Sequence, residues 1–151
     1  MRFEQTISTA VDPTRAWTAL AEVTAFPAWT RSMTSVEPLD GADLRVGRRY
    51  RIRQPGMLAL VWRVSQVREG ESFVWESRVA GVRTVASHEL SADPAGGARI
   101  TLSIDQSGAL AGLIGALTGG RTRRYLRMEA DGLKAASESP GGPAGTAGGG
   151  A

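Results

Sequence analysis

The chain has 151 residues, of which 42% are apolar and 22% charged, and it contains no cysteine. This length and composition are typical of one globular domain with its own core, and the lack of cysteine excludes disulfides, thiolate metal sites and thiol nucleophiles. The net charge is +3, and the basic residues are not gathered into a recognisable nucleic-acid-binding module. We therefore expect no nucleic-acid partner.

Two further classes of segment are missing from the sequence. Residues 1–11 lack the continuous apolar core of a signal peptide. No stretch approaches the roughly 20 apolar residues that a membrane-spanning helix needs. We therefore expect a cytoplasmic protein without a membrane span.

The first elements of the chain are a strand followed by one or two short helices. Apolar and polar residues alternate over residues 2–9, which predicts a half-buried strand. Asp12 and Pro13 then predict a helix start, because Asp is a good N-cap and Pro loses no hydrogen bond at the first helical position. This helix is expected to end near residue 22 or 23. The aromatic segment 26–29 predicts a turn or a second short helix.

The middle of the chain consists of short alternating segments separated by Gly, Pro and Asp turns. These segments are residues 33–39, 46–54, 58–67, 73–79, 82–90 and 99–107. Because the connections are short and contain no helix, the segments predict an antiparallel meander. The polar residues at alternate positions indicate that one face of this sheet is in contact with water.

The segment from residue 108 to residue 138 predicts one principal helix. Its apolar residues recur at three- and four-residue spacing; they are Leu110, Leu113, Ile114, Leu117, Tyr125, Leu126, Met128 and Leu133. We expect this apolar stripe to cover the concave face of the sheet. Four glycines in its first half each weaken a helix by about 1 kcal/mol relative to alanine. This suggests that residues 109–117 are mobile or form a separate short helix able to gate a cavity.

These elements predict an α+β fold over residues 1–138. A curved antiparallel sheet of about six to seven strands wraps around the long C-terminal helix, with one or two short helices after the first strand. Residues 139–151 contain mainly Gly, Ala and Pro, and we expect them to form a disordered tail outside the domain.

The order of elements and several local motifs resemble the helix-grip, START-like superfamily, and more narrowly its bacterial polyketide cyclase/dehydrase-type members. The motifs are Ala10–Trp17 at the entry to the first helix, Phe26–Trp29, Val46-Gly47, the pair Trp62-Arg63-Val64 and Phe73-Val74-Trp75, Gly108, and Leu133-Lys134. The resemblance spans residues 2 to about 138. It implies a cavity under the long helix that accepts small or medium-sized hydrophobic molecules, but it carries over no invariant catalytic residue.

Within such a cavity, a few polar residues are candidates for chemistry. His88 is the only histidine, and strand alternation places it on the apolar side with Thr84, Ala86 and Leu90. A neutral imidazole there could act as a general base or orient a ligand, although a histidine satisfied by a neighbour in the core is an open alternative. Tyr50 is the second candidate catalytic residue, with the alternative of a core tyrosine.

The remaining candidates are residues expected to contact the ligand. They are Trp29, Trp62, Trp75, Leu102, Leu117, Arg121 and Tyr125. Arg121 could bind a carboxylate or an oxyanion, with a solvated arginine as the alternative. With one histidine and no cysteine, we expect no metal site, and without a phosphate-binding loop we expect no nucleotide cofactor.

Two functions remain open at this point. One is an enzyme that acts on a polyketide-like or other carbonyl compound as a cyclase, dehydratase or isomerase. The other is a non-catalytic protein that binds or transports a lipid or another hydrophobic metabolite. Both predict the same cavity, and they differ in whether its polar groups take part in a reaction. The sequence leaves the oligomeric state open.

Overall fold

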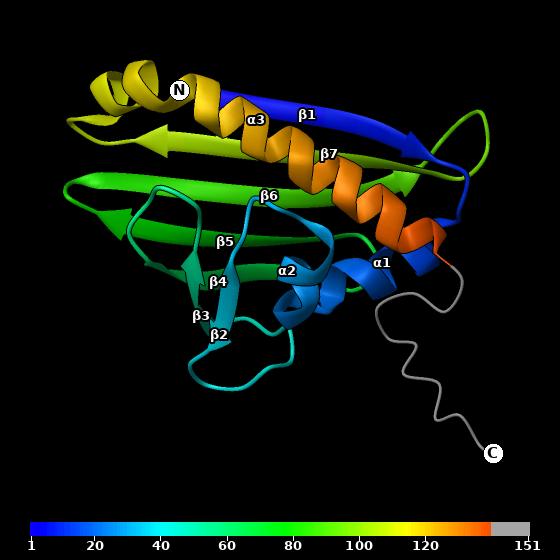
Figure 1. The fold of residues 1–151 in the computed structure, drawn as a ribbon. Helices are drawn as coiled ribbons and strands as arrows, with labels where there is room; N and C mark the ends of the chain where they lie inside the picture. Colours follow the sequence, from blue (N-terminus) through cyan, green and yellow to red (C-terminus); the bar gives the residue numbers. More distant parts are fainter. Residues whose placement is uncertain (140–151) are drawn as a thin grey trace.

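A seven-stranded antiparallel sheet curves around one long helix in the computed structural model, which describes residues 1–139 (Figure 1). The strands are β1 (Arg2–Thr9), β2 (Ser35–Pro38), β3 (Arg49–Arg53), β4 (Leu60–Arg68), β5 (Ser72–Val79), β6 (Val82–Ala92) and β7 (Ala98–Ser107). The helices are α1 (Pro13–Ala21), the 3₁₀ turn η1 (Val23–Ala25), α2 (Phe26–Trp29) and α3 (Ala111–Glu138). The predicted tail lies outside the described residues, apart from Ser139.

The sheet order is β1-β7-β6-β5-β4-β3-β2, and every neighbouring pair is antiparallel. Strands β2 to β7 form the predicted meander, whereas β1 pairs with β7, so that Arg2 lies opposite Asp105 and Thr9 opposite Ala98. The helices α1 and α2 connect the two edges of the sheet. The predicted helix-grip fold is confirmed.

The start of α1 follows the local chemistry of its sequence. The Asp12 carboxylate accepts a hydrogen bond from the Arg15 backbone N–H at 2.9 Å, and Pro13 takes the first helical position. The helix buries Ala16, Trp17, Ala19 and Leu20. The expected second helix is also present, as the single turn α2.

The long helix differs from the prediction in its first half. Residues 111–138 form one continuous helix, so the separate short helix considered for residues 109–117 is not observed. Its buried face there consists of Ala111, Gly115 and Gly119, while Leu113 and Leu117 are 61% and 76% exposed. The expectation that Leu117 faces the cavity is therefore not met.

The cause is the close approach of α3 to β1. A Cβ on Gly115 would lie 2.4 Å from Met1 Sδ, and a Cβ on Gly119 would lie 3.3 Å from a ring carbon of Phe3. Because only small residues fit at this distance, the glycines rather than the leucines face the sheet. The apolar periodicity alone does not reveal this rotation of the helix.

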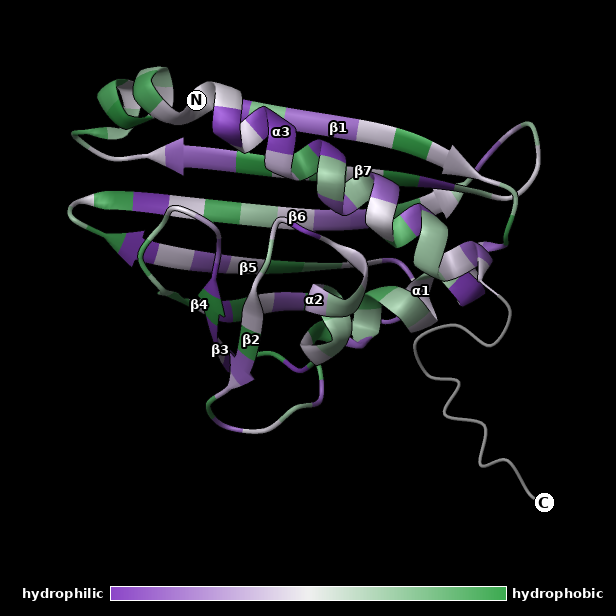
Figure 2. Cartoon of the chain, in the orientation of Figure 1, coloured by the Kyte–Doolittle hydropathy of each residue, from purple (hydrophilic) through white to green (hydrophobic). Residues whose placement is uncertain are grey.

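The core lies between the concave face of the sheet and the helices α1, α2 and α3. Its largest fully buried side chains include Trp75, Tyr50, Phe26, Phe73 and Leu133. Along the strands, apolar and polar residues alternate in Figure 2, as expected for a sheet with one wet face. The buried cluster includes side chains of α1, α2 and the second half of α3 that meet the sheet, among them Leu20, Phe26 and Leu133.

Candidate functional site

A pocket of about 380 Å³ opens at the end of the molecule where α3 begins. Its sheet side is formed by Trp62, Ser77, Thr84, Ile104 and Gln106. Its helix side is formed by Ile114, Thr118, Arg121, Thr122 and Tyr125, and residues of the β3–β4 loop and the β5–β6 turn complete the mouth. Among residues 1–139, no carboxylate lines this pocket, and Arg121 is the single charged residue that does. The pocket is therefore suited to a mainly apolar molecule.

A smaller cavity of about 40 Å³ lies deeper between the sheet and α3. It is lined by His88, Glu129, Trp75, Leu126 and Met33, among others. The small cavity and the large pocket share three lining residues, Gln54, Trp62 and Ile104. The two volumes therefore adjoin and form one site, with a wide outer part and a narrow inner part that has room for a small polar group or a water molecule.

A buried pair of titratable side chains lies at the inner part. His88 Nε2 and Glu129 Oε1 are 2.9 Å apart, within hydrogen-bond distance, and the two residues are 3% and 7% exposed. His88 comes from the middle of β6 and Glu129 from α3, so the pair joins the sheet to the helix across the core. Buried groups of this kind are rare unless they are paired.

Aromatic rings fix the orientation of the His88 imidazole. The Phe73 ring is stacked on it at 4.2 Å between ring centroids, with an interplanar angle of 11°. Trp75 contacts it edge-on at 5.5 Å between centroids. The register of the sheet places Phe73 directly opposite His88 on β5. The imidazole is therefore held in one plane between a carboxylate and two aromatic neighbours.

The geometry defines what the His88–Glu129 pair can do chemically. When His88 carries its proton on Nε2, that N–H donates to the Glu129 carboxylate and Nδ1 is left as an acceptor. Nδ1 is buried and has no hydrogen-bond partner among residues 1–139. A carboxylate behind an imidazole orients the ring and stabilises its protonated form. In this tautomer, Nδ1 is therefore the ring nitrogen left without a protein partner within the described residues.

The structure brings five of the seven predicted ligand-contact residues to the site. Trp62, Trp75, Leu102, Arg121 and Tyr125 line one or both parts of it. The Tyr125 hydroxyl donates to the Pro55 carbonyl oxygen at 2.6 Å and so ties α3 to the β3–β4 loop.

Three other predicted residues, Trp29, Leu117 and Tyr50, line neither part of the site. Trp29 packs beside Phe26, with 4.6 Å between ring centroids. The Tyr50 hydroxyl donates to the carbonyl oxygens of Ala42 and Asp43, both at 3.1 Å, and burial raises the pKa of this phenol. Tyr50 therefore fastens a loop and does not face His88 with its hydroxyl.

Glu129 is the residue of the site that the sequence analysis did not include among its candidates. Its position carries a signal that would have placed it. Glu129 follows Tyr125 by four residues and precedes Leu133 by four, and both of these residues are buried. Residues at this spacing share one helix face, so Glu129 lies on the inward face with them.

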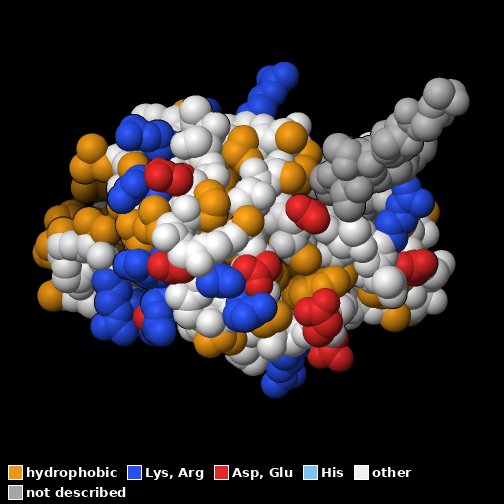
Figure 3. Space-filling model, turned by 90° about the horizontal axis from the view of Figure 1, so that it is seen from below, with side chains coloured by type: hydrophobic (Ala, Val, Ile, Leu, Met, Phe, Trp, Pro, Cys, Tyr) orange, Lys and Arg blue, Asp and Glu red, His pale blue; other side chains and the backbone are white. Residues whose placement is uncertain are grey.

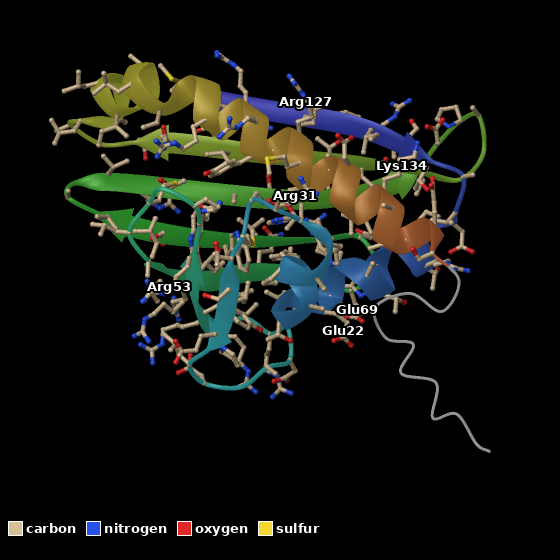
Figure 4. The ribbon with its side chains drawn as sticks, viewed as in Figure 1. Glu22, Arg31, Arg53, Glu69, Arg127 and Lys134 are labelled. Atoms are coloured by element: carbon tan, nitrogen blue, oxygen red, sulfur yellow. The ribbon has the colours of Figure 1, made fainter. Side chains whose placement is uncertain are left out.

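Apolar and basic side chains gather around the mouth of the pocket. Leu58, Val79, Leu110 and Leu113 are between 45% and 84% exposed. Figure 3 shows orange apolar side chains at this end of the molecule, beside a group of basic ones. The charged side chains of Arg53 on β3 and Arg127 on α3 lie on the outside, away from the pocket (Figure 4).

Two other kinds of feature are missing from the described part of the chain. Residues 1–139 contain no group of three or more His, Cys, Asp or Glu side chains placed to hold a metal ion. Within the same residues, no helix combines the length and the apolar character required to cross a membrane.

The fold and the pocket can now be compared with known proteins. The Zhui aromatase/cyclase from Streptomyces sp. R1128 superimposes with a TM-score of 0.74 at 14% identity, over 91% of this chain and 93% of that one. The hypothetical protein jhp0584 from Helicobacter pylori also superimposes with a TM-score of 0.74, at 14% identity, over 90% of this chain and 86% of that one. The XoxI protein from Bacillus cereus superimposes with a TM-score of 0.71, at 11% identity, over 89% of this chain and 94% of that one. At these identities the likeness concerns the fold alone.

The sequence itself identifies the family. Among curated proteins, none matches this sequence at a significant level. The profile of a family described as "Polyketide cyclase / dehydrase and lipid transport" matches residues 1–138, which are all of the helix-grip domain. The chain belongs to the polyketide cyclase/dehydrase and lipid-transport family.

Proposed function

We propose that this protein binds a small or medium-sized hydrophobic carbonyl compound between the sheet and α3, and that His88, oriented by Glu129, acts on it as a general base. The observation that carries the proposal is the buried His88–Glu129 hydrogen bond at the inner end of an apolar pocket. The reaction class is a cyclisation or dehydration of the kind that begins with enolate formation.

The proposed reaction starts with one proton transfer. His88 Nδ1 removes a proton from a carbon next to a carbonyl group, and the electrons of the C–H bond form an enolate. The Glu129 carboxylate stabilises the imidazolium that results, in a buried environment where this interaction is stronger than in water. The enolate carbon then attacks a second carbonyl of the same molecule, whose oxygen takes the proton back from His88 and becomes a hydroxyl group. In a dehydration, the enolate instead expels a β-hydroxyl group, which takes the proton from His88 and leaves as water.

The pocket contributes orientation to this chemistry. A flexible carbonyl compound loses conformational entropy when its ring closes, and this loss raises the barrier. Binding in a reactive shape removes that entropy before the reaction and so lowers the barrier. The aromatic rings of Trp62 and Trp75 supply flat apolar walls for such a compound. Membership of a cyclase/dehydrase family supports the proposed reaction class.

A non-catalytic carrier of a lipid or another hydrophobic metabolite is the alternative. It is favoured by the absence of any carboxylate among the residues that line the large pocket, because a carrier needs only apolar walls. The two functions predict the same binding and differ in proton transfer by His88.

The test uses benzoylacetone, an apolar aromatic β-diketone with an acidic C–H group. We expect the protein to accelerate exchange of this proton for deuterium, followed by NMR, and to bind the compound with quenching of tryptophan fluorescence. His88→Asn should bind the compound as the wild type does, but its rate of exchange should be about 100-fold lower, a typical contribution of a general base. Glu129→Gln should lower the exchange rate less than His88→Asn does, because an amide oxygen can still accept a hydrogen bond from His88 Nε2–H.

The matched control is Ser91→Ala, which removes an exposed hydroxyl from the same strand, β6, at a residue that lines neither part of the site. It should leave both binding and exchange unchanged. Equal exchange rates for the wild type and both site variants, with binding retained, would refute the base and favour the carrier.

A further inference from the structure

A row of polar side chains crosses the inner face of the sheet in the large pocket. Ser77 on β5 lies opposite Thr84 on β6, and Thr84 lies opposite Gln106 on β7. All three residues line the large pocket. Thr84 and His88 are four residues apart on one strand, so the row faces the same side of the sheet as His88.

Two members of this row each have a buried polar atom without a hydrogen bond. Ser77 is 4% exposed, and its Oγ atom has no partner in the described part of the chain. Gln106 is a partly buried residue, but its Oε1 atom is inaccessible to solvent and has no partner within residues 1–139. Such a group costs about 1–3 kcal/mol of stability when it is left unsatisfied. Alanine at position 77 and leucine at position 106 would avoid this cost. A ligand that enters the pocket and bonds to these polar groups explains why they are there.

The row and the imidazole form two separate polar positions. Four residues along a strand correspond to about 13 Å between Thr84 and His88. An apolar row lies between them, in which Trp75 is opposite Ala86 and Ala86 is opposite Ile104. The inner surface of the site therefore changes from polar to apolar and back to polar along the strands.

We propose that the site selects an elongated apolar molecule with an oxygen function at each end. One hydroxyl or carbonyl group bonds to the Ser77–Thr84–Gln106 row. The reacting carbonyl group lies at the other end, where its enol hydroxyl, or the phenol of a probe that mimics it, donates to His88 Nδ1. The inference rests on the proposed function and names its substrate class. A hydrocarbon chain with one polar head would leave one of the two polar positions without a partner.

The test compares three rigid probes of nearly the same shape, which are stilbene, 4-hydroxystilbene and 4,4′-dihydroxystilbene. Binding is measured by titration calorimetry on the whole protein. We expect affinity to rise by roughly fivefold with each hydroxyl group, the usual effect of one hydrogen bond between neutral groups. Ser77→Ala and Gln106→Leu should each lower the affinity for the dihydroxy probe by roughly fivefold and leave the affinity for stilbene unchanged.

Two controls separate ligand binding from a structural role. Ser91→Ala, at an exposed position of β6 that lines neither part of the site, should not change the affinity for any probe. Ser77→Ala should leave the urea midpoint unchanged or raise it, because it removes an unsatisfied buried hydroxyl. A lower midpoint together with unchanged affinities would show that the row is structural and would overturn the inference.

The outcomes also separate this inference from the proposed function. If the three probes bind with equal affinity, selection by the polar row is refuted and the apolar pocket stands. If none of them binds, the proposed function fails, and the inference fails with it.

Discussion

The two ends of the concave sheet face are built from the same strands but filled with side chains of different size. At one end, which we call the packed end, β5, β6 and β7 present Phe73, Leu90 and Ile100, all of them buried. At the other, the open end, the same strands present Ser77, Thr84 and Gln106 around the 380 Å³ pocket. The difference shows that a change in side chains along the same strands, from large and apolar to polar, accompanies the change from a packed core to an open pocket.

The course of α3 follows the same division. Its first half lies close on β1 through Gly115 and Gly119, whereas its second half buries the larger Leu126, Glu129 and Leu133. The helix therefore reaches into the core only at the packed end. The His88–Glu129 pair lies where the two ends meet.

The largest expected effect comes from truncating a side chain at the packed end. Phe73 is 0% exposed and stacks on His88, so Phe73→Ala should cost about 3–5 kcal/mol in free energy of unfolding. Val79→Ala, on the same strand at the open end and 48% exposed, should cost less than about 0.5 kcal/mol. Urea unfolding of both variants measures the contrast, and similar costs would show that the ends are packed alike.

A smaller effect is expected from two glycines of α3. A Cβ on Gly132 would lie 2.1 Å from the Trp29 carbonyl oxygen, so Gly132→Ala should destabilise the protein by about 1–3 kcal/mol. A Cβ on Gly120 would meet no atom within 4 Å in the described structure, and Gly120→Ala should stabilise the helix by up to about 1 kcal/mol. The midpoint temperature of thermal unfolding should fall in Gly132→Ala and rise in Gly120→Ala. A higher midpoint for Gly132→Ala would contradict the close packing of α3 against Trp29.

The smallest effect concerns one hydroxyl group that is satisfied. The Tyr50 hydroxyl has two backbone acceptors, unlike the Ser77 hydroxyl at the open end. Tyr50→Phe should therefore cost about 1 kcal/mol at neutral pH, whereas Ser77→Ala should cost nothing. The comparison is made by urea unfolding under identical conditions.

The contribution of Tyr50 should also depend on pH. Burial raises its pKa in the folded state above the ordinary value of 10.0, so the unfolded chain loses the phenolic proton first. The contribution is fully present below about pH 10 and is lost as the pH rises through the folded-state pKa. The stability difference between wild type and Tyr50→Phe should shrink above pH 10. A constant difference would contradict the raised pKa.

Most of the fold could be predicted because its signals are local. Alternation along the strands placed Phe3, Trp62, Trp75, His88 and Leu102 on the inner face, where the structure has them. The Asp12-Pro13 start of α1 follows from capping chemistry alone. The order of elements then left one plausible arrangement, in which the long helix covers the sheet.

The parts that could not be predicted depend on contacts between distant segments. Leu117 faces outward because Gly115 and Gly119 let α3 lie on β1, a contact that apolar periodicity cannot show. The Tyr50 hydroxyl is turned to Ala42 and Asp43 by a loop whose path no local pattern determines. Glu129 was predictable in principle from its four-residue spacing, but a charged residue on an inward face is discounted until its partner is known.

The pairing of β1 with β7 has a consequence for how the chain folds. Phe3 and Ile7 find their partners Ile104 and Ile100 only after about a hundred residues have been added between them. Closing so long a loop carries a high entropic cost before any contact is formed. During synthesis, the first strand therefore waits unpaired until β7 has left the ribosome. We therefore expect the sheet to be completed late, and folds dominated by contacts distant in sequence typically form on the millisecond-to-second scale.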